Sequence, residues 1–143
     1  MRGVEGSGEF LRLVWSPNGI GALLATTGLI TWTSVSLWSG VSAGAGLDMH
    51  EAWQTPAYFY IGVPIMALAV AAAAFLMPDR PWRWALWLAG GHQLGLLVLG
   101  VGMQSGLSLV LATLILGILL AVGFVVPAML GAMVGRAMTE RAY

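Results

Sequence analysis

The chain has 143 residues, of which 59% are hydrophobic and 8% are charged, and its six basic and six acidic residues leave no net charge. This composition excludes the basic surface that nucleic-acid binding requires, and the absence of cysteine excludes disulfides and thiolate metal sites. Four apolar blocks are each long enough to cross a bilayer core about 30 Å thick. They lie at 18–41, 57–77, 82–103 and 107–134. We therefore expect an all-α, multi-pass membrane protein in which residues 1–143 form a single domain, a bundle of four transmembrane helices in the lipid bilayer.

The positions of the arginines predict how the chain threads the membrane. All six basic residues are arginines, and they lie before the first block, between the second and third, and after the fourth: Arg2, Arg12, Arg80, Arg83, Arg136 and Arg141. The loop between the first two blocks contains neither arginine nor lysine. The positive-inside rule therefore predicts that both termini are cytoplasmic, and we expect the bacterial inner membrane as the location. The Val-Ser-Ala segment at 41–43 resembles a signal-peptidase site, but the first block is longer than the apolar region of a typical signal peptide, so we expect it to be retained.

The first block begins at a helix-start signal and carries several hydroxyl side chains. In the segment WSPNG, Ser16 suits the N-cap of a helix and Pro17 suits its first turn. Thr27, Thr31 and Ser34 follow at i, i+4 and i+7, so they share one helix face. These hydroxyls can line a hydrated path or bond to the histidine of the third block. Alternatively, they bond back to carbonyls of their own helix.

The loop between the first two blocks contains three possible metal ligands. In LDMHEAW, these are Asp48, His50 and Glu51. The same residues are common in ordinary solvated loops, and Asp48 also suits a helix cap. The motif is therefore weak, and we expect no metal or other cofactor.

Aromatic residues lie near the ends of the blocks, as membrane interfaces favour. We expect one aromatic belt on the outer side, made by Trp38, Trp53, Tyr58 and Tyr60, and another on the cytoplasmic side, made by Trp82, Trp84 and Trp87.

Two polar residues, His92 and Gln93, lie at the centre of the third block. Adjacent residues of a helix point about 100° apart, so the two side chains serve different neighbours. His92 can form an interhelical hydrogen bond, relay a proton or solute, ligate haem or contact a partner subunit, and Thr27 and Thr31 are its candidate partners within the chain. The other histidine, His50, lies in the outer loop, so haem ligation by two histidines of one chain is not expected.

Small residues mark the expected contacts between helices. GxxxG pairs and alanines four residues apart let helix backbones approach closely. These residues are Gly91 with Gly95, Gly131 with Gly135, and Ala67 with Ala71.

The fourth block is long and contains a proline. Its length in helical form, about 42 Å, exceeds the thickness of the hydrocarbon core and requires tilt, a bend or protrusion. Pro127 cannot donate a hydrogen bond to the carbonyl of Gly123, which predicts a kink there. The kink can be a static packing feature or a hinge.

The segments EAWQTPAYFYIGVP and PDRPWRWAL, followed by GGHQLG, resemble a loose group of small four-span bacterial inner-membrane proteins. In that group, an outer-loop tryptophan precedes an aromatic, Gly-x-Pro helix start, and a Pro-Arg-Trp turn opens a third span that carries a glutamine. The resemblance covers about residues 51–95 and implies topology and location, but no activity. His92 stands where such proteins often have a small or apolar residue, which leaves its role open.

The blocks contain no aspartate or glutamate, and the chain has no HExxH. We therefore expect a non-enzymatic protein, a small subunit that packs against copies of itself or against a larger membrane complex. The alternative is a small oligomeric channel or transporter for a small solute or a proton, with His92 and Gln93 at the membrane midplane.

Overall fold

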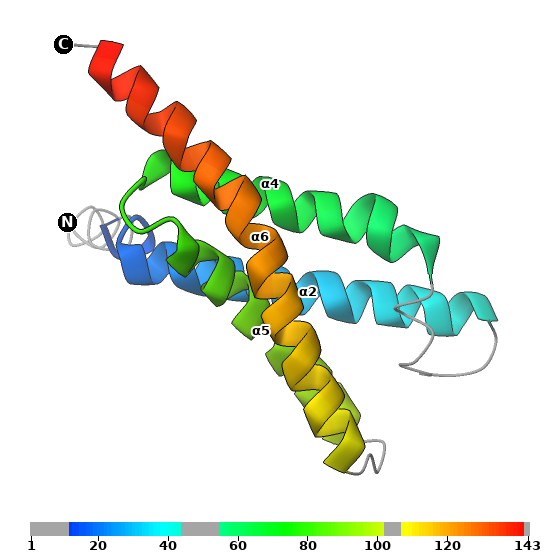
Figure 1. Cartoon of the computed structure of the whole chain (residues 1–143). Coiled ribbons are helices and arrows are strands. Elements are labelled where there is room, and N and C mark those ends of the chain that lie inside the picture. Colours follow the sequence, from blue (N-terminus) through cyan, green and yellow to red (C-terminus); the bar gives the residue numbers. More distant parts are fainter. Residues whose placement is uncertain (1–11, 44–54, 102–106, 142–143) are drawn as a thin grey trace, which may run out of the picture.

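The computed structural model describes residues 12–43, 55–101 and 107–141 (Figure 1). Within these ranges every regular element is a helix: α2 (Pro17–Ala43), the π-helical turn η1 (Tyr58–Gly62), α4 (Val63–Leu76), α5 (Trp82–Val101) and α6 (Leu107–Arg141). In the part of the chain that the structure describes, three segments are long and apolar enough to cross a membrane, namely Pro17–Trp38, Tyr58–Leu76 and Leu114–Arg141. The expected all-helical fold is confirmed, and three of the four expected spans meet this test.

Helix α2 starts where the sequence predicts. The Ser16 Oγ accepts a hydrogen bond of 3.0 Å from the Gly19 N–H, which satisfies a donor of the first helical turn. The Ser16 hydroxyl also donates to the Leu13 carbonyl at 2.6 Å. These bonds explain why the helix begins at Pro17.

The second apolar segment begins with a π turn, which the sequence analysis did not predict. The Val63 N–H donates to the Tyr58 carbonyl, five residues earlier, and Pro64 lies in the first turn of α4. Because Pro64 has no N–H, it cannot donate to the preceding turn, and the regular α-helical ladder is interrupted there. The wider turn of η1 lies at this interruption.

Helices α2 and α5 run in the same direction and pack closely. The ring of Trp87 lies against Gly21, and the backbone of Ala25 lies against Gly91 four residues further along both helices. A side chain at either glycine would occupy the space of its neighbour. The missing side chains therefore set how closely the two helices approach.

Helices α4 and α6 form a second parallel pair. Gly131 lies against the backbone of Ala71, and Gly135 lies against the backbone of Phe75. Ala67, one turn before Ala71, is partly buried against the core. Each parallel pair thus joins two long helices that are separated in the chain by one other long helix. Successive long helices run in opposite directions.

The beginning of α2, the turn between α4 and α5, and the end of α6 lie at the same end of the molecule (Figure 1). Arg136 donates from Nη2 to the Pro78 carbonyl at 3.1 Å, which attaches α6 to this turn. Within the turn, Arg80 adopts a left-handed conformation with φ of 52°. Several of the arginines in the described residues are therefore gathered at one end.

Helix α6 continues to Arg141, beyond the predicted end at 134. The apolar block stops where charged residues begin, but backbone hydrogen bonds continue the helix through exposed Arg136 and Glu140. The 35 residues give a length of about 52 Å, well beyond the bilayer core. The helix also runs through Pro127 without a break, and the space beside Gly123 is open.

Candidate functional site

Three side chains from three different elements meet in the core beside the centre of α5. Trp32 comes from α2, Tyr58 from η1 and His92 from α5, and their exposed fractions are 0%, 1% and 0%. His92 therefore lies inside the protein and away from lipid. The cluster of Trp32, Tyr58 and His92 is called the histidine cluster below.

The histidine cluster is held by one hydrogen bond and by edge-to-face ring contacts. The Tyr58 hydroxyl and the His92 Nε2 share a hydrogen bond of 2.9 Å. The Trp32 ring centroid lies 4.9 Å from that of His92 and 5.8 Å from that of Tyr58, both in edge-to-face geometry. Such ring pairs contribute about 0.5–1.5 kcal/mol beyond burial. The cluster thus links α2, η1 and α5.

The His92 Nε2 has the phenol of Tyr58 as its partner and not one of the candidate threonines of the first block. The Thr27 Oγ1 instead donates to the Leu23 carbonyl of its own helix at 2.9 Å. Thr31 places its methyl group near Gly62, and Ser34 is exposed. Thr26 and Thr33 also bond back to carbonyls of α2. The hydroxyls of Thr26, Thr27 and Thr33 therefore donate to carbonyls of their own helix, as the alternative interpretation predicts.

Sequence reasoning missed Tyr58 because tyrosine near the end of an apolar block is typical of an interfacial belt. That prediction is wrong for Tyr58 and also for Trp84, which is 1% exposed and donates from Nε1 to the Met77 carbonyl at 3.0 Å. Trp38 and Tyr60 are exposed, as a belt requires. One signal was present: Tyr58 and Tyr60 are the only residues of the second block with a side-chain hydroxyl.

Gln93 faces a different neighbour from His92, as the helix geometry predicts. It lies opposite Gly117 of α6, where a Cβ would come within 2.8 Å of the Gln93 Cγ. A groove of about 330 Å³ lies between α5 and α6 at this point. Its lining includes Gln93 and the small residues Ala89, Gly90, Gly117 and Ala121. We call it the α5–α6 groove.

The three candidate metal ligands of the first loop, Asp48, His50 and Glu51, lie outside the described residues. Within the described ranges, no three His, Asp or Glu side chains are grouped to hold a metal ion.

Comparison with protein-family models, with curated proteins and with solved structures finds no match to this chain. Function is therefore inferred from the residues and contacts of this chain alone.

We expect Tyr58→Phe to lower the free energy of unfolding by about 1–2 kcal/mol, because the buried His92 Nε2 then loses its hydroxyl partner. Unfolding of the full chain in mixed detergent and SDS micelles measures this change. Tyr60→Phe is the matched control, since Tyr60 is 81% exposed, and it is expected to change stability by less than about 0.5 kcal/mol. Equal stability of the two variants would contradict a stabilising role for the bond.

Proposed function

We propose that this chain is a four-span protein of the bacterial inner membrane with both termini in the cytoplasm. Helix α5 is the additional span. Its 20 residues reach about 30 Å, and its one charged residue, Arg83, lies in its first turn. The alternating directions of α2, α4, α5 and α6 fit four successive crossings, and their arginine-rich end fits the cytoplasmic side.

Within this topology, the function is non-enzymatic, that of a small subunit that packs against another membrane helix. The α5–α6 groove is the observation that carries this proposal, because small residues line it. Small residues allow another helix to approach closely. The helix comes from a second copy of this chain or from a larger membrane complex.

The exposure of α6 supports the same proposal. In its most apolar window, 11% of the residues are buried within the protein, compared with 33% for the first span and 28% for the second. Helix α6 thus contributes least to the internal core and has the largest surface left for a neighbour.

The burial of His92 favours a packing subunit over a channel or transporter. A residue that binds a moving solute or proton must be reachable from a path, whereas His92 is 0% exposed and covered by Trp32 and Tyr58. The groove beside Gln93 has no ionisable group in its lining. These contacts fit interhelical packing.

Filling the α5–α6 groove tests the proposal. We expect wild-type protein, extracted from its native membranes in mild detergent, to appear in native mass spectra as an oligomer or with a partner subunit. Ala121→Leu is expected to shift it towards the isolated monomer, because the larger side chain occupies the groove.

Ala72→Leu is the matched control, since Ala72 is exposed on α4, and we expect its assembly to equal that of wild type. Circular dichroism checks that both variants keep the helical fold. A strictly monomeric, partnerless wild-type protein would overturn the proposed function.

A further inference from the structure

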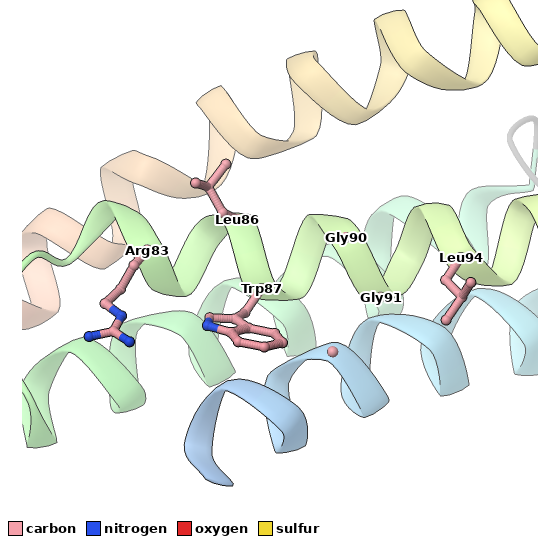
Figure 2. A pocket seen from close by; sticks show the side chains of 7 residues that line it. Arg83, Leu86, Trp87, Gly90, Gly91 and Leu94 are labelled. Atoms are coloured by element: carbon pink, nitrogen blue, oxygen red, sulfur yellow. The ribbon is translucent and has the colours of Figure 1, made fainter. Parts of the chain in front are cut away.

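A second groove lies on α5, on the side that faces α2 (Figure 2). It has a volume of about 380 Å³ and extends from Arg83 past Trp87 and Gly90 to Leu94. In Figure 2 the side chains of Arg83, Trp87 and Leu94 point to the same side of α5, and those of Trp87 and Leu94 point towards α2. We call it the Arg83 groove. Unlike the α5–α6 groove, the Arg83 groove has a positively charged side chain at one end.

The length of the Arg83 groove matches the depth of one membrane leaflet. The rise from Arg83 to Leu94 along an α-helix is about 16 Å, and half of a bilayer core is about 15 Å. Arg83 lies beside the α4–α5 turn, at the arginine-rich end, and Leu94 lies near the middle of α5. The groove therefore runs from a membrane surface to the midplane.

The wall and floor of the groove are apolar. Trp87 packs its ring on Gly21 of α2 and remains 40% exposed, so it forms one wall. A Cβ at Gly90 would meet no atom within 4 Å, so the missing side chain leaves an open floor. Exposed Leu86 and Leu94 flank this position. The shape suits an extended hydrocarbon chain.

The mouth of the groove is positively charged. The Arg83 guanidinium lies 5.0 Å from the centroid of the Trp84 ring. Among the described residues it forms no ion pair, and exposed Asp79 in the same turn is not bound to it. The first turn of α5 has no acidic residue, and a helix N-terminus is itself the positive end of the helix dipole. This end of the groove is therefore complementary to an anion.

We propose that the Arg83 groove binds one anionic phospholipid from the leaflet on the arginine-rich side. The phosphate contacts the Arg83 guanidinium, and one acyl chain lies over Gly90 between Trp87 and Leu94. A lipid fits both parts of the groove, because its charged phosphate lies at the membrane surface and its acyl chain extends from there to the midplane. The site requires α5 to cross the membrane, as proposed above, but it does not require a partner subunit.

Lipid retention measured by native mass spectrometry tests this proposal. The full chain is exchanged into nanodiscs that contain phosphatidylglycerol and phosphatidylcholine in equal amounts, and bound lipid is counted after gentle release. Wild type is expected to retain one phosphatidylglycerol in preference to phosphatidylcholine. Arg83→Gln is expected to lower this retention about fivefold, which is the typical effect of one arginine at an anionic lipid surface.

Arg80→Gln is the matched control, because it removes the same charge from the same turn at an exposed position outside the groove. It is expected to retain phosphatidylglycerol as wild type does. Gly90→Leu keeps every charge and places a side chain on the floor, where its Cβ meets no atom within 4 Å, and it is expected to lose the lipid while circular dichroism shows an unchanged fold.

Equal retention by Arg83→Gln and Arg80→Gln, or equal retention of the two lipids by wild type, would overturn the proposal. The same spectra report the number of protein copies. A monomer that retains phosphatidylglycerol would contradict self-association and support the lipid site, whereas an oligomer without preferential lipid retention would do the reverse.

Discussion

Gly91→Ala is expected to lower the free energy of unfolding by about 1–3 kcal/mol, whereas Gly90→Ala is expected to raise it by about 0.5–1 kcal/mol. A Cβ at Gly91 would overlap the backbone of Ala25, which cannot move without shifting α2 away from α5. A Cβ at Gly90 would meet no atom within 4 Å, so only the better helix propensity of alanine remains. Two neighbouring glycines should therefore respond to the same substitution with opposite signs.

Reversible unfolding of both variants in mixed detergent and SDS micelles measures this difference. The two substitutions change the same atoms at adjacent positions of one helix, so each is a control for the other. Equal effects at Gly90 and Gly91 would show that close contact between α2 and α5 does not depend on Gly91.

Trp32→Ala is expected to lower the free energy of unfolding by about 3–5 kcal/mol, the largest effect of any single substitution considered for the histidine cluster. Trp32 is fully buried and contacts the rings of both Tyr58 and His92, so its removal leaves a cavity where α2, η1 and α5 meet. The loss combines transfer energy, packing and the ring contacts.

Trp38→Ala is the matched control, because Trp38 belongs to the same helix and is 73% exposed. It is expected to change stability by no more than about 0.5 kcal/mol. Both variants can be followed by thermal unfolding in detergent with circular dichroism as the signal. A Trp32→Ala variant as stable as Trp38→Ala would mean that the cluster does not hold the three elements together.

Local signals in the sequence predicted the helices well, because helix starts and apolar length depend on neighbouring residues alone. The Ser16 cap and the start at Pro17 are examples. The π turn could not be predicted in this way, since its wider hydrogen bond depends on how the segment before Pro64 packs. The end of α6 was also missed. The bounds of an apolar block show which side chains are compatible with lipid, and they do not show where the backbone hydrogen bonds of the helix end.

The histidine cluster was predictable in part. Depth alone indicated that His92 needs a hydrogen-bond partner. The identity of that partner depends on which face of α5 turns inward and on where η1 crosses it, and neither is encoded in local spacing. The GxxxG pair predicted the close contact at Gly91, but GGHQLG did not indicate that Gly90 opens onto two grooves.

The π turn of η1 also affects how the residues before and after it are oriented around the axis of the second apolar segment. One residue in an α-helix corresponds to about 100° of turn, and a π turn accommodates an extra residue without passing that rotation on to the rest of the helix. Loss of one residue from 59–62 would therefore leave an ordinary α turn between Tyr58 and Val63, and both the α4–α6 contacts and the bond of Tyr58 to His92 would be kept.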